Sequence, residues 1–205
     1  MLLEGKNISF QYKRGSWILQ DVDISIESGE IVGLTAPSGY GKSTLGRILA
    51  GYERPQKGSV KLNREDIPKN GYNPVQLIFQ HPEKAVNSRW HMRDILKEGW
   101  EPDDKLLRSL GVEKDWLNRW PNELSGGELQ RFCVARALGP QTQFLIADEM
   151  TTMLDAITQA QIWHIVLEVA RKQNLGVLVI SHEKQLIDRL CDRVIDLTTI
   201  NQINV

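Results

Sequence analysis

Residues 31–44 read IVGLTAPSGYGKST, an apolar run followed by a glycine-rich segment. The run Ile31 to Thr35 predicts a short buried strand, and a helix is expected from about Lys42 to Ala50. A glycine-rich turn between a strand and a helix suits phosphate, because its backbone N–H groups and the helix N-terminus surround the anion. The stretch matches the phosphate-loop pattern GxxxxGK[ST], except that Ala36 replaces the first glycine.

The chemistry of such a loop assigns roles within it. Lys42 is expected to reach the β- and γ-phosphates of a nucleotide, and the Ser43 hydroxyl to bind Mg²⁺. If residue 36 needs a positive φ, alanine there costs on the order of 1 kcal/mol, and otherwise it is harmless. The alternative is a glycine-rich turn with no ligand. The predicted nucleotide-binding residues of the loop are Ala36, Ser38, Gly39, Tyr40, Gly41, Lys42, Ser43 and Thr44.

Apolar runs on both sides of this loop predict the fold class. Before it, hydrophobic residues alternate over 8–12 and 18–26, which is typical of paired strands. After it, further strands are expected near 60–62, 75–79, 144–147 and 176–180, with helices after 125 and over 157–172. Strands that alternate with helices indicate an α/β protein with a mostly parallel core sheet. An N-terminal antiparallel β subdomain is expected to precede that sheet.

The segment 81–124 differs from its surroundings. It is polar, rich in tryptophan and patterned for helices, with leucines at 106, 107 and 110. We therefore expect one domain over 1–205, in which 1–80 and 125–205 form the core with its β subdomain and 81–124 is an inserted helical subdomain. Its tryptophans are expected to form the core or a docking surface of the insert: Trp90, Trp100, Trp116 and Trp120.

Two acids follow the apolar run 144–147. Ligands of open α/β sheets bind outside the carboxyl ends of the strands, where these acids are expected to lie. Asp148 would hold Mg²⁺, mostly through water. Glu149 would orient and polarise a water that attacks the γ-phosphate. A solvated acidic strand end is the alternative for this pair taken alone.

Residues 124–131, LSGGELQR, decide the family. Ser125 and Glu128 have the spacing of a capping box, and the glycines leave backbone N–H groups free at the helix start. The stretch resembles the LSGGQ signature of ATP-binding cassette (ABC) ATPases, with Glu128 at the fifth position. The resemblance implies a P-loop fold of ABC type with a RecA-like core. It also implies that Ser125, Gly126, Gly127 and Glu128 face the ATP bound by a partner subunit.

The same resemblance assigns further residues. Tyr12 resembles the aromatic that stacks on adenine; Trp17 is the weaker candidate, and either residue could instead be a sheet-face aromatic. Gln80 matches the Q-loop glutamine, which senses Mg²⁺ or the attacking water, and Asp155 matches the D-loop aspartate. His182 matches the switch histidine at the γ-phosphate. The remaining histidines, His81, His91 and His164, are expected to be structural.

Residues 79–89 and 130–138 resemble the nickel and oligopeptide uptake branch of the family. Members of that branch often combine two different ATPase subunits, each paired with a different permease. Two departures stand in the stretch after Glu149, where Met150 and Thr152 replace the usual proline and serine.

Composition sets limits on partners. The formal net charge of the 205 residues is −1, which indicates no nucleic-acid partner. No apolar run approaches the roughly 20 residues that span a bilayer, and no secretory signal is expected at the start. A cytoplasmic subunit is therefore predicted, held on the inner face of the cell membrane by transmembrane permease subunits.

The sequence thus predicts an ATPase subunit of an ABC transporter that takes up nickel or peptides and uses ATP and Mg²⁺. It would work as a homodimer or as a heterodimer with a second ABC ATPase, and with a solute-binding protein indirectly. ATP binding would close the dimer and move the permeases. Two alternatives are a non-transport ABC ATPase of DNA repair or translation, and a weakly active partner in an asymmetric pair.

Overall fold

A computed structural model of the chain describes residues 1–12, 15–68 and 70–203. Its helices and strands run in the order β1 (Leu2–Phe10), β2 (Leu19–Glu27), β3 (Ile31–Thr35), α1 (Lys42–Leu49), β4 (Lys57–Leu62), β5 (Val75–Ile78), α2 (Met92–Lys97), α3 (Asp104–Ser109), α4 (Gly126–Ala137), β6 (Phe144–Asp148), α5 (Ala156–Gln173), β7 (Gly176–Ile180), α6 (Lys184–Leu190), β8 (Arg193–Asp196) and α7 (Leu197–Ile200). Short 3₁₀ turns lie at Pro82–Lys84, Lys114–Asn118 and Pro121–Glu123.

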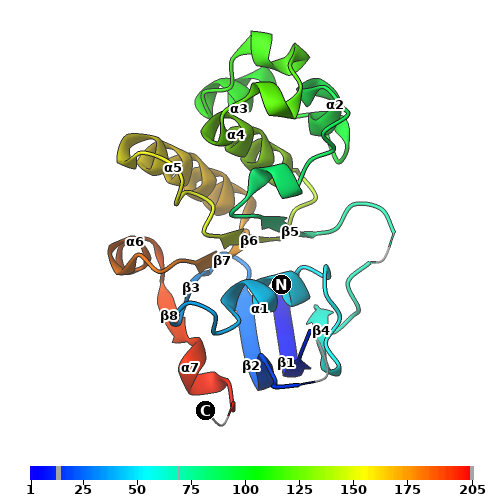
Figure 1. Cartoon of the computed structure of the whole chain (residues 1–205), viewed down its shortest axis with the longest axis vertical. Helices are drawn as coiled ribbons and strands as arrows, with labels where there is room; N and C mark the ends of the chain where they lie inside the picture. The colour runs from blue at the N-terminus through cyan, green and yellow to red at the C-terminus, as the bar shows by residue number, and fades with distance from the viewer. Residues whose placement is uncertain (13–14, 69, 204–205) are drawn as a thin grey trace.

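The centre of the molecule is a parallel five-stranded sheet with the order β5-β6-β7-β3-β8 (Figure 1). Every residue of β6 and β7 is buried, which explains why these strands read as unbroken apolar runs in the sequence. The predicted parallel core is confirmed.

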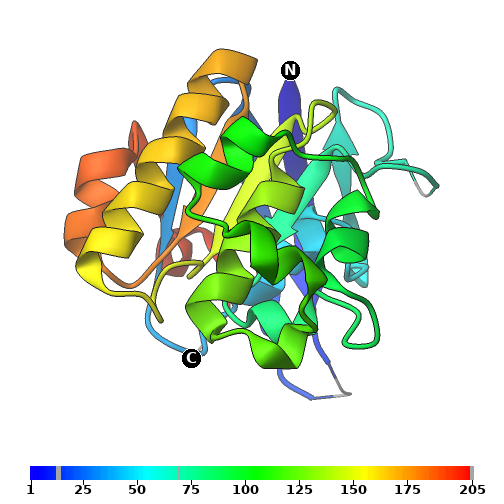
Figure 2. The ribbon, with the colours of Figure 1, turned by 90° about the horizontal axis from the view of Figure 1, so that it is seen from above.

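Both faces of this sheet are covered. Along β6, Leu145 and Ala147 point to a core that also contains residues of α4 and α5. Their neighbours Phe144 and Ile146 point to the other core, formed with α1, β1 and β2. Figure 2 shows α4 and α5, the helices of this first core, in front of the strands. The alternation of side chains along one strand therefore supplies both layers of a three-layer α/β fold.

The second sheet is antiparallel and has the order β2-β1-β4. Leu3 of β1 lies opposite Ile26 of β2 and Leu62 of β4, and all three side chains are buried. This sheet packs on α1 and on one face of the parallel sheet through a shared apolar core. The predicted N-terminal antiparallel sheet is confirmed.

The segment between β5 and α4 consists of α2, α3 and the 3₁₀ turns, as the helical pattern predicts. Met92, Ile95 and Leu110 are buried against α4 in the first core. Figure 1 shows these short helices and α4 at the end of the molecule opposite the antiparallel sheet. The boundaries of a separate subdomain at 81 and 124 stay a prediction.

The tryptophans of this segment divide between core and surface. Trp116 packs partly buried against the first core, and the Trp100 indole donates to the carbonyl oxygen of Arg136 at 2.9 Å. Trp90 and Trp120 keep 41% and 39% of their surface exposed, and the Trp120 ring lies 4.0 Å from that of His91. Trp116 thus meets the core part of the expectation, and a docking role for the exposed pair stays a prediction.

The C-terminal strand β8 and the helices α6 and α7 are not among the elements that the sequence pattern predicts. β8 is an edge strand of four residues, none of them buried, so it lacks the apolar run that marks β6 and β7. The Arg193 guanidinium fixes it to the start of β3 through an ion pair with Glu30 and a bond to the carbonyl oxygen of Ser25. This bond to Arg193 holds the pKa of Glu30 below its ordinary value.

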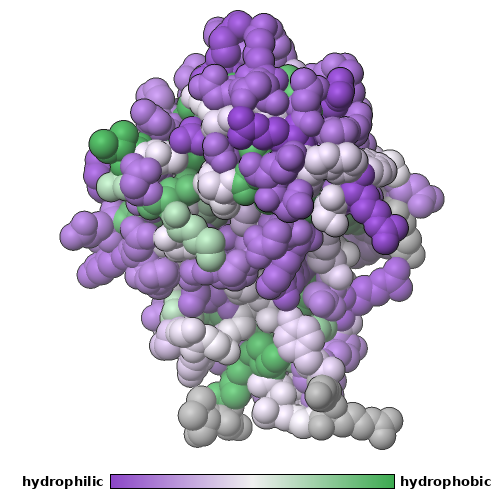
Figure 3. Space-filling view, turned by 45° about the horizontal axis from the view of Figure 1, so that its top comes forward, coloured by the Kyte–Doolittle hydropathy of each residue, from purple (hydrophilic) through white to green (hydrophobic). Residues whose placement is uncertain are grey.

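No helix of the described residues is long and apolar enough to cross a membrane. The face seen in Figure 3 is largely hydrophilic, and its hydrophobic side chains form small separate patches.

We predict that Arg193→Met lowers the free energy of unfolding by about 0.5–1 kcal/mol at neutral pH, because the ion pair with Glu30 is partly exposed to solvent. Because the pKa of Glu30 is lowered in the folded protein, the pair stabilises the fold above the ordinary glutamate pKa of about 4.3. This stabilisation is lost as pH falls through the pKa that Glu30 has in the folded protein. Urea titrations at pH 7 and pH 3.5 should show the larger deficit at the first pH. An equal deficit at both would contradict this, and Arg189→Met on α6 is the surface control.

Candidate active site

The phosphate loop lies between β3 and α1, where the sequence predicts it. Gly41 precedes α1 with φ +100°, and Gly39 has φ +81°. A Cβ on Gly41 would also lie 3.0 Å from side-chain atoms of Ile18 and Leu19. Both positions therefore need glycine, Gly39 for its backbone angle and Gly41 for its angle and for space.

The φ angle of Ala36 is not positive. Only a positive φ would make glycine preferable at this position. Its side chain packs, partly buried, against the apolar core shared by α1 and β3. The departure from the glycine pattern therefore introduces no backbone strain.

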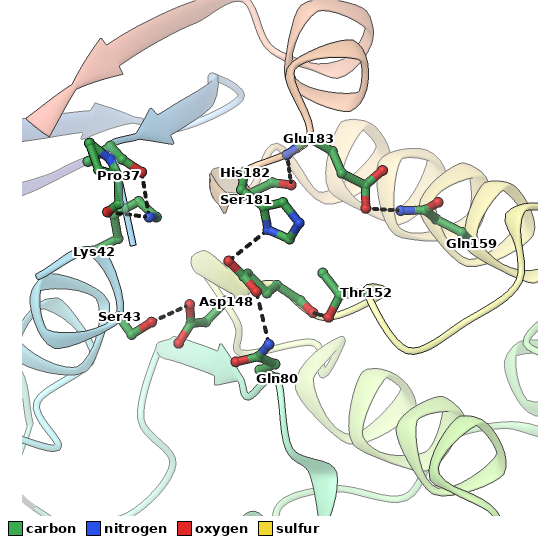
Figure 4. Close-up of polar contacts among 12 residues, drawn as sticks. Pro37, Lys42, Ser43, Gln80, Asp148, Thr152, Gln159, Ser181, His182 and Glu183 are labelled. Atoms are coloured by element: carbon green, nitrogen blue, oxygen red, sulfur yellow. Dashed lines mark hydrogen bonds and ion pairs between the residues drawn. The ribbon is translucent and has the colours of Figure 1, made fainter. Parts of the chain in front are cut away.

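Lys42 begins α1, and only 8% of its surface is exposed. Its ammonium donates to the carbonyl oxygens of Ala36 at 2.7 Å and Pro37 at 3.2 Å, so it lies across the loop (Figure 4). The buried positive charge of Lys42 therefore lies inside the glycine-rich loop, at the start of α1.

Ser43 and Asp148 connect the loop to the central sheet. The Ser43 hydroxyl donates to the Asp148 carboxylate at 2.9 Å, and Asp148 is the last residue of β6. Burial raises the pKa of Asp148, although the bond from Ser43 opposes this shift. The carboxylate is 4% exposed, so its charge calls for a cationic partner in this place.

Glu149 follows Asp148 directly and turns away from the strand with φ 49°. Left-handed backbone at a residue other than glycine is uncommon and occurs often at functional sites. Hydrogen bonds hold it: its N–H donates to Ile180 of β7 at 3.0 Å, and its carbonyl oxygen accepts from the Thr152 hydroxyl at 3.0 Å. The Thr152 hydroxyl thus holds the backbone of Glu149, the residue that the sequence predicts to be catalytic.

The Glu149 carboxylate lies between two side chains from the neighbouring strand ends. Gln80 donates from Nε2 to one carboxylate oxygen at 2.9 Å, and Nδ1 of His182 lies 3.1 Å from the other. In Figure 4 the labelled side chains of Gln80 and His182 point toward this same group from opposite sides. Glu149 is 18% exposed at its side chain and His182 63%, so the group opens to solvent on the histidine side.

The stretch 125–128 begins α4 with the predicted capping box. Ser125 Oγ accepts from the N–H of Glu128 at 3.3 Å, and the Glu128 carboxylate accepts from the N–H of Ser125 at 2.7 Å. These bonds lower the pKa of Glu128. A Cβ built on Gly126 has no atom within 4 Å, so this residue faces open space, whereas a Cβ on Gly127 would lie 2.9 Å from Leu154. Among the described residues, no hydrogen bond joins 125–128 to the phosphate loop.

Two further expected residues lie at the edges of this arrangement. The Tyr12 hydroxyl is 3.3 Å from Oγ1 of Thr44 in the phosphate loop, and 51% of Tyr12 is exposed. Trp17 instead has the Lys57 ammonium over its ring at 5.5 Å. Asp155 caps α5 by accepting from the N–H groups of Ile157 and Thr158, which lower its pKa.

The comparisons with known proteins agree with this geometry. The profile of the family described as "ABC transporter" matches residues 19–152. The oligopeptide transport ATP-binding protein OppF of Streptococcus mutans is 35% identical, over 94% of this chain and 70% of that protein. The nickel import system ATP-binding protein NikE of Staphylococcus aureus is 36% identical, over 96% and 86%.

Among solved structures, the dimeric structure of MJ0796, a bacterial ABC transporter cassette, has a TM-score of 0.79 and 25% identity, covering 95% of this chain and 93% of that one. The chain belongs to the ABC transporter family. Within it, the chain is an ATP-binding subunit and an ATPase.

We predict that Ala36→Gly leaves the affinity for ATP within about twofold of wild type, because residue 36 lacks the backbone angle that would favour glycine. Added backbone freedom would lower stability by about 0.5–1 kcal/mol. Equilibrium binding of a fluorescent ATP analogue and a urea titration measure the two effects. A gain in affinity of tenfold would show that the alanine does weaken the loop.

Proposed function

We propose that this chain is the ATPase subunit of a membrane importer for nickel or peptides. The observation that carries hydrolysis is the Glu149 carboxylate, held between Gln80 and His182 beside the phosphate loop. The solute class is supported by the likeness to the peptide protein OppF and the nickel protein NikE over nearly the whole chain. Permease subunits would hold the chain at the inner face of the cell membrane.

In this proposal the loop N–H groups and Lys42 bind the β- and γ-phosphates of ATP. Glu149 orients and polarises the attacking water and can accept its proton, while Gln80 holds the other oxygen of the same carboxylate. His182 contacts the γ-phosphate from its exposed side. Phosphoryl transfer depends on such positioning and charge neutralisation more than on covalent chemistry by the protein.

The residues around Asp148 fit a magnesium ion. Ser43, Gln80 and Asp148 offer only oxygen ligands, as Mg²⁺ prefers, and the buried Asp148 carboxylate has a raised pKa that a cation would reverse. Bound there, Mg²⁺ would neutralise charge on the β- and γ-phosphates.

We further propose that two ATPase subunits enclose each ATP. The open space over Gly126 supports this, because the helix start at 125–128 is free to meet a phosphate from outside its own chain. The solved MJ0796 cassette is a dimer by its description. The partner here is a second copy or a different ABC ATPase. The D-loop role of Asp155 belongs to the same proposal, and its present contacts are those of a helix cap.

A weakly active subunit would need a defect in its phosphate loop, and Ala36, which departs from the glycine pattern there, lacks the positive φ that would strain it. A DNA-repair or translation role has no specific observation in its favour.

We predict that Glu149→Gln binds ATP with wild-type affinity and lowers its turnover by about 10²- to 10³-fold, because the neutral amide cannot accept a proton from the attacking water. The amide oxygen still accepts from Gln80, so the local fold is kept. Phosphate release and ATP binding should be measured together. Turnover at the wild-type rate would remove Glu149 from this role.

We predict that Gly126→Trp abolishes turnover while the single chain still binds ATP. Nothing lies within 4 Å of the added Cβ, so the side chain leaves the helix into open space, where it would block a phosphate that approaches this helix start. Gly126→Ala is the matched small variant and should keep most of the activity. Loss of ATP binding by the monomeric Trp variant would contradict a role toward a partner's ATP.

Affinity purification from gently solubilised membranes of the protein's own cells tests transport. We expect permease-like proteins to copurify, together with a second ATPase if the motor is a heterodimer. Recovery with soluble proteins or nucleic acid alone would contradict the transport proposal and leave the ATPase assignment standing.

A further inference from the structure

Gln159 connects two loops of the candidate active site. Its side-chain nitrogen donates to Oγ1 of Thr151 at 3.0 Å and to the Glu183 carboxylate at 3.4 Å. Thr151 lies two residues after Glu149, and Glu183 directly follows His182. Figure 4 shows Gln159 reaching Glu183 from α5, on the far side of the histidine loop from the phosphate loop.

One end of this connection is held rigidly. Gln159 lies in the first turn of α5, whose start is capped by Asp155. One turn later, the buried Trp163 donates from its indole nitrogen to the same Thr151 oxygen at 3.1 Å. Residues four apart lie on one face of a helix, so two donors of α5 hold a hydroxyl that is 2% exposed. The loop that follows Glu149 is therefore fixed to α5.

The other end is the loop after β7. The Glu183 N–H donates to the hydroxyl of Ser181, which is 3% exposed at the end of the strand. The His182 side chain between them is 63% exposed, so packing contributes little to its position. The hydrogen bond from Gln159 to Glu183 is the direct side-chain link from this loop to α5.

We propose that Gln159 and Glu183 form a positioning pair that sets where the His182 imidazole stands relative to the Glu149 carboxylate. This inference rests on the proposed function, because it concerns the same two groups. Neither member touches the reacting atoms. The Gln159 amide has two N–H groups, and each can donate to one of the two acceptors, the Thr151 hydroxyl and the Glu183 carboxylate. A carboxylate acceptor strengthens the second of these bonds.

The test is an exchange of the pair in the purified full chain. Gln159→Glu removes both donors and places a second carboxylate against Glu183. We expect kcat for ATP to fall about tenfold, in line with the cost of misplacing a catalytic group, while KM stays within about twofold. The reversed pair, Gln159→Glu with Glu183→Gln, restores a donor and an acceptor across the same gap. It should regain most of the lost kcat, a coupling that a double-mutant cycle measures.

Thermal unfolding and one further variant separate the explanations. Glu168→Gln, at an exposed carboxylate later on α5, controls for the loss of surface charge. Wild-type kcat in Gln159→Glu would overturn the positioning pair. So would a reversed pair that stays slow, or a loss of kcat that follows a lowered melting temperature in every variant. If wild type fails to hydrolyse ATP, or Glu149→Gln turns over freely, the proposed function fails instead.

Discussion

The placement of one carboxylate, that of Glu149, decides how the rest of the site is built. The strand order β5-β6-β7 brings three consecutive strand ends to one edge of the sheet, and each end supplies one side chain. Gln80 comes from the first, Glu149 from the second and His182 from the third. The next strand, β3, leads into the phosphate loop. The parallel sheet therefore places the phosphate loop and the Glu149 carboxylate at the same edge.

This geometry requires a strained backbone at Glu149 and a buried charge at Asp148, and hydrogen bonds from neighbouring residues stabilise both. The left-handed backbone of Glu149 would cost on the order of 1–3 kcal/mol on its own, and bonds to Ile180 and Thr152 hold it. The buried Asp148 carboxylate receives a hydrogen bond from Ser43. Both arrangements leave charged groups at the sheet edge, where an ATP–magnesium substrate would meet them.

Much of this site could be predicted from the sequence because its motifs are local. The phosphate loop, the acid pair and the start of α4 each combine a strand or helix signal with short-range chemistry, and all three lie where the pattern puts them. The parallel sheet follows from buried runs such as β6 and β7. The roles of the motif residues toward ATP come from resemblance and stay a prediction.

What the sequence could not indicate depends on contacts between distant residues. β8 is exposed and gains its place from the ion pair of Arg193 with Glu30. The amide of Gln159 bonds Thr151 and Glu183, eight and 24 residues away, which no local pattern indicates. The consequence of Ala36 depended on a backbone angle, which only the structure gives.

In this geometry Gln80 and His182 act on one shared carboxylate, that of Glu149. The most direct test is the turnover number for ATP in Gln80→Leu, in His182→Ala and in the double variant. If both side chains hold Glu149, the double variant should be about as slow as the slower single one, because groups that act as a unit are non-additive. Losses that multiply would show that the two residues act independently and would contradict the account.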